Sequence, residues 1–241
     1  MIISGKNSVK EALSAGKTDK VYILSGNTDR QLGEIARQAK DAGARVVYAE
    51  KAVLDKLSPG GKHQGAAAEI SEYEYASADD IFAFAETRGE EPVILILDGV
   101  QDPMNLGAVM RSAECLGAHG VIIGKHRAAS VSETAIKASA GAAEHVLCAK
   151  VGNINDVIRE LKERFVKVYA AEADGNPIDS ADLRGAVAIV IGGEGDGVKR
   201  LTRELCDGVV SIPMKGKLNS LNASVAAGIV LYETLRQRGS S

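Results

Sequence analysis

The chain has 241 residues, 45% hydrophobic and 25% charged, a composition typical of a globular protein with one large domain or two smaller ones. No apolar run reaches the roughly 18 residues of a membrane-spanning helix, and the first residues lack the layout of a signal peptide, so we expect a cytoplasmic protein. The net charge of −3 and the scarcity of aromatic residues argue against nucleic-acid binding through bulk positive charge.

The first part of the chain has the pattern of a small α/β domain. The predicted elements are a strand at 20–25, a helix at 28–43 with Thr28 as N-cap, a strand at 45–50, a glycine-rich loop at 57–65 and a strand from 65 onward. A short helical pattern follows in an acidic stretch. We therefore place an N-terminal domain at 1–72, a linker at 73–91 and a second domain at 92–241.

In the second domain, continuous apolar runs alternate with helical patterns. The runs lie at 92–98, 120–124, 145–151, 166–172, 186–193 and 208–214, and the helical patterns at 105–117, 132–142, 154–165, 198–205 and 222–238. Uninterrupted apolar runs are typical of strands buried on both faces, so the alternation predicts an α/β fold with a parallel sheet covered by helices. Ligands bind such sheets at the carboxyl ends of the strands.

The three cysteines, Cys115, Cys148 and Cys206, are far apart and odd in number. No CxxC pair is present, so the sequence predicts neither a zinc site nor a disulfide framework. We expect buried, inert thiols and no bound metal.

The first polar strand exit is LDGVQDPMNLGAVMR, residues 97–111. Asp98 ends the strand, and we expect Asn105 to cap the following helix. Gly107 and Arg111 are four residues apart and share one helix face, so the missing side chain would let another group approach beside the arginine. The plainer alternative is an asparagine cap with a surface arginine.

The second exit is VIGGEGDGV, residues 190–198, with four glycines. It is no phosphate loop, because no Gly-Lys-Ser/Thr follows, and its spacing does not match GxGxxG. Glu194 would repel a phosphate, so the loop better suits a cationic or hydrogen-bond-donating ligand. A simple turn of glycines is the alternative.

The third exit is SIPMKGKLNSLNASVAAG, residues 211–228. A basic loop leads into a helix that begins with polar groups, Asn219, Ser220 and Asn222, and continues with small residues that allow close packing. A capping box needs fewer polar groups. We therefore expect some of these side chains to bind something other than the helix end.

Together the three stretches resemble the motifs of the TrmH (SpoU-type) ribose 2′-O-methyltransferases of the SPOUT superfamily, in the family's order and at strand-to-helix junctions. GKNSVKEAL (5–13) and KHQG (62–65) are similar to the family's N-terminal RNA-binding domain, which is related in fold to small ribosomal proteins. With both halves present, the chain resembles most the RlmB-type enzymes, which methylate a guanosine ribose of 23S ribosomal RNA.

The resemblance implies a SPOUT domain with a deep trefoil knot, S-adenosylmethionine as cofactor, RNA as substrate and a homodimer with its site near the subunit interface. The catalytic residues it implies are Asn105, Arg111, Glu194, Ser220 and Asn222. The cofactor-binding residues it implies are Gly192, Gly193, Ile212, Pro213, Met214 and Leu221.

Because guanidinium has a pKa above about 12, Arg111 is better suited to hold an RNA phosphate or stabilise a developing alkoxide than to act as a general base. Local cations would contact RNA phosphates. The candidates are Lys6, Lys62, His63, Lys125 and Arg127, with Lys10, His126, Lys215 and Lys217 in similar loops; about half would be ordinary surface residues. His119 and His145 flank strands, and we expect them to be structural.

Three alternatives stay open at this point. One is ribose methylation of a transfer RNA or of another ribosomal nucleotide. A second is a nucleotide-dependent oxidoreductase, which would need a glycine fingerprint after the first strand of the sheet, where this chain has none. The third is a non-enzymatic RNA-binding protein, for which the set of polar residues at the strand exits would be superfluous.

Overall fold

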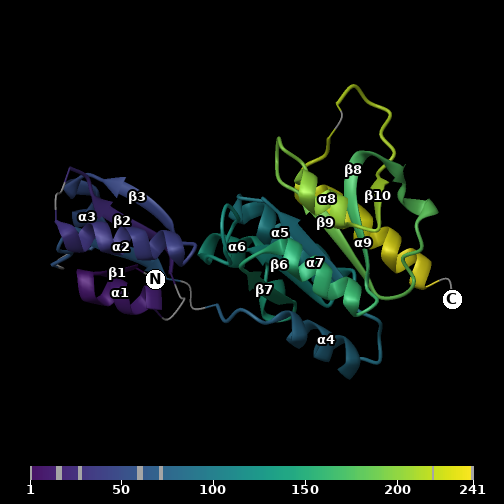
Figure 1. The fold of residues 1–241 in the computed structure, drawn as a ribbon, viewed down its shortest axis with the longest axis horizontal. Helices are drawn as coiled ribbons and strands as arrows, with labels where there is room; N and C mark the ends of the chain where they lie inside the picture. The colour runs from purple at the N-terminus through teal and green to yellow at the C-terminus, as the bar shows by residue number, and fades with distance from the viewer. Residues whose placement is uncertain are drawn as a thin grey trace. The chain divides into compact units, whose positions relative to one another are not determined.

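The computed structural model describes residues 2–14, 18–26, 29–58, 62–70, 73–218 and 220–239. The chain divides into two compact units, Met1–Glu74 and Tyr75–Ser241, both drawn in Figure 1. The helix predicted in the linker is α4 (Ala78–Thr87), which contacts strand β7 of the second unit. From Tyr75 onward the predicted linker thus belongs to the second unit. In the described part of the chain, no helix is long and apolar enough to cross a membrane.

The N-terminal unit is a four-stranded sheet in the order β1-β4-β2-β3, packed against helices. Its elements are β1 (Ile2–Ser4), α1 (Lys6–Ser14), β2 (Thr18–Leu24), α2 (Arg30–Asp41), β3 (Arg45–Ala49), α3 (Lys51–Leu57) and β4 (Ala66–Ile70). Strands β2 and β3 are parallel, and β4 is antiparallel to β1 and β2. The sequence had indicated β2, α2, β3 and β4, whereas β1, α1 and α3 were not predicted as elements.

Helix α2 starts with Asp29 as its N-cap, whose side chain accepts a hydrogen bond from the Gln31 backbone N–H. The predicted cap, Thr28, lies outside the described residues. On the buried face of α2, Leu32 and Ile35 pack on Val21 and other apolar residues in the core of the unit. This apolar face ties α2 to the sheet.

The second unit contains a six-stranded sheet in the order β10-β8-β9-β5-β6-β7, in which every pairing is parallel. The prediction of a parallel sheet is confirmed. The strands are β5 (Val93–Asp98), β6 (Gly120–Gly124), β7 (Leu147–Val151), β8 (Lys167–Pro177), β9 (Val187–Gly192) and β10 (Gly208–Ser211). The helices are α5 (Pro103–Cys115), α6 (Glu133–Ser139), α7 (Ile154–Glu163), α8 (Arg200–Leu205) and α9 (Ala223–Arg238), with short 3₁₀ turns at Ala142–Glu144 and Ile178–Ser180.

Helices cover both faces of this sheet. On one face, apolar residues of α4, α7 and the α8 region pack against alternate strand residues such as Ile94 and Ile96. The intervening residues Leu95 and Leu97 point to the other face, since strand side chains alternate, and they are fully buried as well. Helices α5 and α9 contact each other and strands β6 and β9. The second unit is therefore a three-layer α/β/α structure, as its uninterrupted apolar runs had indicated.

The strand order brings distant parts of the sequence to one edge. Strand β9 lies between β8 and β5, with Asp98 opposite Gly192 and Ala171 opposite Ile191. The exits of β5 and β9 are therefore neighbours at the carboxyl edge of the sheet, with the middle of β8 beside them. The trefoil knot implied by the resemblance stays a prediction.

The structure shows that one of the two histidines expected to be structural, and one of the three cysteines, differ from expectation. His119 is structural, as predicted: it is fully buried, its Nδ1 accepts from the Val93 N–H, and its Nε2 donates to Glu90. Burial lowers the pKa of His119 and keeps the ring neutral. His145, by contrast, is exposed. Among the thiols, Cys148 is buried and Cys206 half-buried, whereas Cys115 is exposed because it ends α5.

Candidate active site

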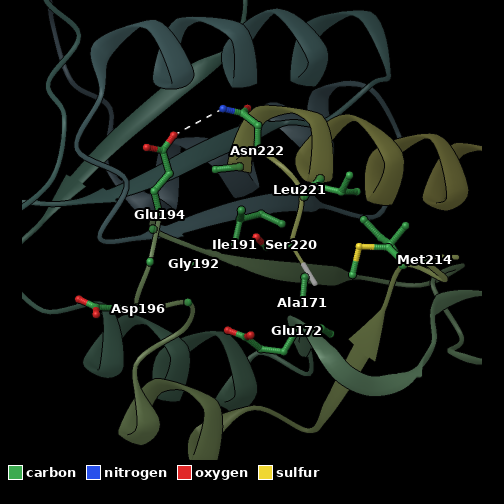
Figure 2. Close-up of a pocket in the computed structure, with 17 residues that line it drawn as sticks. Ala171, Glu172, Ile191, Gly192, Glu194, Asp196, Met214, Ser220, Leu221 and Asn222 are labelled. Atoms are coloured by element: carbon green, nitrogen blue, oxygen red, sulfur yellow. Dashed lines mark hydrogen bonds between the residues drawn. The ribbon is translucent and has the colours of Figure 1, made fainter. Parts of the chain in front are cut away.

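A cavity of about 580 Å³ opens at the carboxyl end of β9, beside the middle of β8 (Figure 2). Its size falls within the range of small-molecule sites, about 300–1,000 Å³. Three segments line it, namely the middle of β8, the glycine loop after β9, and the stretch from β10 into the start of α9. Its lining residues are Ala171–Ala173, Ile191–Gly197, Ile212, Met214, Ser220–Ala223 and Ala226.

The glycine loop is shaped by backbone contacts that leave no room for side chains. A Cβ on Gly192 would lie 2.1 Å from the carbonyl carbon of Gly197, and one on Gly193 would lie 2.3 Å from the carbonyl oxygen of Gly99. Gly197 has a φ of +64°, which L-residues rarely adopt. The glycines thus let the loop fold back on itself and on the end of β5. The bare backbone predicted at Gly192 and Gly193 lines the cavity.

An ion pair between a buried carboxylate and an exposed lysine fixes the far end of this loop. Asp98 is 2% exposed at the end of β5; its carboxylate pairs with the Lys199 ammonium and accepts from the Lys199 backbone N–H at 3.1 Å. The Gly193 N–H donates to the Asp98 carbonyl oxygen at 2.9 Å. Residues on both sides of the loop are therefore attached to one strand end.

Three polar side chains from the three strand exits form one hydrogen-bonded network. The Asn105 Nδ2 donates to Glu194 Oε1 at 2.6 Å, and the Asn222 Nδ2 donates to Asn105 Oδ1 at 3.0 Å. The Asn222 Nδ2 also lies 3.5 Å from Glu194 Oε1, the contact drawn in Figure 2. We call Asn105, Glu194 and Asn222 the amide–carboxylate network. It joins segments that are 89 and 117 residues apart in the chain.

Asn105 does not have the capping role that the sequence predicted. The N-cap of α5 is Asp102, accepting from the Met104 N–H at 2.9 Å, with Pro103 at the first helical position. Asn105 is consequently free to turn its amide toward the network. It is 7% exposed, and both ends of its amide are bonded there.

Asn222 does cap α9, but with only half of its side chain. Its Oδ1 accepts from the backbone N–H of Ser224 at 2.9 Å and from the Ser224 hydroxyl at 2.6 Å. Its Nδ2 belongs to the network. Ser220 lines the cavity without serving as the cap, and Asn219 lies outside the described residues. The prediction that the polar groups here exceed the needs of a cap is confirmed for Asn222, and the role of Ser220 stays a prediction.

Most of the predicted cofactor residues lie around the same cavity. Gly192, Gly193, Ile212, Met214 and Leu221 line it, whereas Pro213 stands between two lining residues without being one itself. The exposed fractions of Met214 and Leu221 are 37% and 40%, large for apolar side chains. Such exposure is expected of side chains that would contact a ligand rather than the core.

Two lining carboxylates were missed. Glu172 is the last residue of a run predicted as a strand, and it accepts a hydrogen bond from the Val198 N–H, which attaches β8 to the glycine loop. Asp196 lies within that loop. The rule of searching strand ends would have found Glu172, since it ends the run VKVYAAE. Together with Glu194 they give the cavity three carboxylates, and its described lining includes no lysine or arginine.

This charge pattern favours a ligand that is cationic or rich in hydrogen-bond donors, because carboxylates repel phosphates. Among the described residues, no group of three His, Cys, Asp or Glu side chains could hold a metal ion. The cavity therefore suits an organic cation.

Arg111 is the predicted catalytic residue that this chain does not bring to the cavity. It is exposed on α5, and its guanidinium forms no hydrogen bond or ion pair with other described residues. The close approach expected at Gly107 is confirmed: a Cβ there would lie 2.3 Å from the Ala135 carbonyl oxygen, so the group that approaches is helix α6. The network residues and Ser220 meet, and Arg111 stands apart.

Two of the predicted RNA contacts in the N-terminal unit have partners within the protein. Lys6 is only 18% exposed and forms an ion pair with Asp29. His63 is 8% exposed; its Nδ1 accepts from the Gly65 N–H and its Nε2 lies 3.1 Å from Asp55 Oδ1. These contacts give Lys6 and His63 structural roles within the unit, and their roles in RNA binding stay predictions.

The other predicted cations are more accessible. Lys62, His126, Arg127, Lys215 and Lys217 are exposed, and Lys10 and Lys125 are half-buried. Their roles in RNA binding stay predictions.

Both units of the chain match known protein families. Residues 92–232 match the SpoU rRNA Methylase family, and residues 2–76 match a domain described as RNA 2′-O ribose methyltransferase substrate binding. YacO of Bacillus subtilis (strain 168), named as a TrmH family tRNA/rRNA methyltransferase, is 41% identical over 98% of this chain and 95% of its own length.

Solved structures are similar over nearly the whole chain. An RNA 2′-O ribose methyltransferase is 29% identical with a TM-score of 0.57, covering 99% of this chain and 88% of its own. An AdoMet-bound rRNA methyltransferase from Sinorhizobium meliloti is 25% identical with a TM-score of 0.60, covering 98% and 86%.

Proposed function

The chain belongs to the SpoU (TrmH) family of RNA methyltransferases, and we propose that it methylates a ribose 2′-hydroxyl of RNA, with a guanosine of 23S ribosomal RNA as its target. The observation that carries the proposal is the amide–carboxylate network beside the acidic cavity. The family membership decides against the oxidoreductase and the non-enzymatic RNA-binding protein. The match of the N-terminal unit to a 2′-O methyltransferase substrate-binding domain supports ribose as the acceptor.

The cavity fits the cofactor of the family, S-adenosylmethionine. This molecule is a sulfonium cation with an ammonium group and an adenine ring. Glu172, Glu194 and Asp196 would supply negative charge to hold it, and the apolar side chains of Ile212 and Met214 would supply a surface for the ring. When bound, the cofactor provides a methyl group that is already activated by the positive sulfur. The protein therefore has to orient the acceptor hydroxyl and take up its proton.

The network is suited to both tasks. Glu194 Oε1 is occupied by Asn105, whereas Oε2 has no hydrogen-bond partner among the described residues. A ribose hydroxyl beside the cavity could donate to Oε2 and pass its proton there or to a water molecule. Ser220, which lines the cavity, offers a second group that can orient the acceptor. The amides of Asn105 and Asn222 hold the carboxylate in place.

We place Arg111 at the cavity of a second subunit. An exposed groove beside it lies between α5 and α9, lined by Ala108, Ser112, Ser224, Val225, Gly228, Ile229 and Tyr232. Helix α9 is apolar on both sides: Val230 and Leu231 are fully buried, while Tyr232 is 60% exposed. Exposed apolar side chains beside an apolar groove are typical of a surface that is buried against a partner. These features support a homodimer through α5 and α9, with Arg111 stabilising developing charge on the acceptor oxygen.

The target can be identified with RNA from a strain that lacks the enzyme. Such RNA is incubated with the protein and S-adenosylmethionine, and the new 2′-O-methyl group is mapped by reverse-transcription stops at low nucleotide concentration. We expect one enzyme-dependent stop at a guanosine of 23S RNA. A stop in a transfer RNA, or at a different ribosomal nucleotide, would replace the proposed substrate with the sibling activity.

A further inference from the structure

The N-terminal unit contains a cavity that has been given no role so far. It measures about 400 Å³ and lies between α2 and the neighbouring strands β2 and β3. We call it the α2 slot, and its lining residues are Ile23, Leu24, Gly26, Asp29, Arg30, Leu32, Gly33, Ala36 and Tyr48. The buried side chains of Ile23, Leu32 and Ala36 make it apolar inside.

Tyr48 forms the wall on the sheet side. In the parallel ladder it is opposite Ile23, so both side chains stand on the face of the sheet that α2 covers. Strand β3 is the edge of the sheet, and Tyr48 is 60% exposed there. The chain has only 4% aromatic residues, and this one lies open beside an apolar slot. Because most of its ring is exposed, Tyr48 contributes little to the packing of the core and is available to contact a ligand.

On the helix side, the slot is lined by Gly33, which has no side chain to fill it. Glycine is disfavoured in a helix interior. Yet a Cβ on Gly33 would find no atom within 4 Å apart from its immediate surroundings in the helix, so packing within the unit does not require glycine there. What the glycine does provide is open space opposite Tyr48.

The mouth of the slot has a favourable charge for RNA. Arg30 is exposed and forms no ion pair with any described residue. The carboxylate of Asp29 is paired with Lys6, and this hydrogen bond holds the pKa of Asp29 below its usual range. Lys6 therefore balances the negative charge of Asp29, and Arg30 adds a positive charge at the mouth of the slot.

We propose that the α2 slot receives an unpaired base of the RNA substrate, stacked on Tyr48, with Arg30 near the phosphates beside it. The proposal rests on the proposed function, because it takes RNA to be the substrate. Proteins read RNA chiefly through bases of loops and bulges that stack on aromatic side chains, and such stacking tolerates any base. An apolar slot with one aromatic wall and an open opposite wall suits a flat ring.

The test uses the full-length protein and two fluorescent RNA probes, a hairpin with an eight-nucleotide loop and a fully paired duplex of the same length. Binding is followed by fluorescence anisotropy. Tyr48→Ala is expected to weaken hairpin binding about 5- to 150-fold, the usual value of one stacked base, with little effect on the duplex. Tyr48→Phe keeps the ring and should bind like the wild type. Phe165→Ala, which removes a 91% exposed aromatic side chain of the second unit, is the matched control.

A second variant separates the slot from damage to the fold. Gly33→Leu fills the slot and replaces glycine by a better helix former, so it should lower hairpin affinity while the melting temperature stays unchanged or rises. Gly185→Leu is its control, because a side chain there also meets open space. The slope of binding against salt should not change in Tyr48→Ala, since no phosphate contact is lost.

The outcomes separate this proposal from the proposed function. Equal hairpin affinities for wild type, Tyr48→Ala and Gly33→Leu would overturn the slot, even if the protein methylates RNA. No binding of the hairpin by the wild type would overturn it too. If Tyr48→Ala loses hairpin affinity while the wild type methylates no RNA, the slot stands and the proposed methylation fails. Calorimetric binding of S-adenosylmethionine should be the same in all variants.

Discussion

Replacing Asn222 by aspartate tests the amide–carboxylate network with a change of a single group. The oxygen that accepts from the Ser224 N–H is kept, so the cap on α9, about 1 kcal/mol, is retained. The amide that donates to Asn105 and faces Glu194 becomes a second carboxylate oxygen. Asn222→Asp therefore places two negative charges side by side without changing the size of the side chain.

The expected loss follows from the 3.5 Å that separates Asn222 Nδ2 from Glu194 Oε1. Two unit charges at that separation repel by about 1 kcal/mol in bulk water and by about 5 kcal/mol at an effective dielectric constant of 20. Both side chains are exposed, so we expect a loss of about 1–3 kcal/mol in the free energy of unfolding near neutral pH. The carboxyl pKa of the pair is raised in the folded variant, so the loss is present above that pKa and is recovered as the pH falls through it.

Urea unfolding at about pH 7.5 and about pH 5 measures this recovery. Asn222→Ala is the control, because it removes the cap and leaves the buried Asn105 oxygen without its donor, a loss of about 1–3 kcal/mol that does not depend on pH in this range. The two variants are therefore distinguished by pH dependence rather than by size. If Asn222→Asp is as stable as the wild type at pH 7.5, or equally destabilised at both pH values, Asn222 and Glu194 are not held together as described.

Three further predictions concern other parts of the second unit. If Arg111 acts in the partner's cavity, mixing and re-associating the inactive variants Arg111→Ala and Asn222→Ala restores about a quarter of wild-type methylation, because half of the dimers then carry one intact site; no restored activity would place both residues in one subunit's site. His119 is held neutral by burial, so its folded pKa lies below the unfolded value and stability falls as the pH drops below about 6.5. His119→Asn, which can keep the acceptor for the Val93 N–H, should lose less melting temperature than the wild type between pH 7.5 and 5.5, and an equal loss would contradict this. Burial raises the pKa of Cys148 to about 12, so iodoacetamide at pH 8 should label the exposed Cys115 long before it labels Cys148, as peptide mass spectrometry would show; labelling at similar rates would mean that the β7 region opens readily.

The layers of the second unit could be predicted from the sequence because a parallel sheet covered on both faces needs strands that are apolar throughout. The polar exits of β5 and β9 and the stretch before α9 were also predictable, since ligands bind there. The strand order was not. Strand β9 lies between β5 and β8, and it is this neighbourhood that sets Glu172 against the glycine loop.

The role of Asn105 shows how a local rule can point to the wrong neighbour. Asparagine is a good N-cap, which favoured Asn105. Proline prefers the first helical position, however, so Pro103 places the cap on the residue directly before it, Asp102. That signal was present in the sequence as Asp102-Pro103. The roles of Lys6 and His63 had no such signal, because their partners Asp29 and Asp55 are brought near them only by folding. Basic residues in loops are easily predicted to contact RNA when their partners are unknown.

The most direct test of the account asks which atom of RNA receives the methyl group. The protein is incubated with S-adenosylmethionine carrying an isotopically labelled methyl group and with unmodified 23S RNA transcribed in vitro. The RNA is then digested to nucleosides for liquid chromatography and mass spectrometry. The account predicts label in 2′-O-methylguanosine, with the methyl retained on the ribose fragment, and loss of that label in Glu194→Gln and Asn105→Ala. Label on a base fragment, or full labelling by both variants, would contradict it.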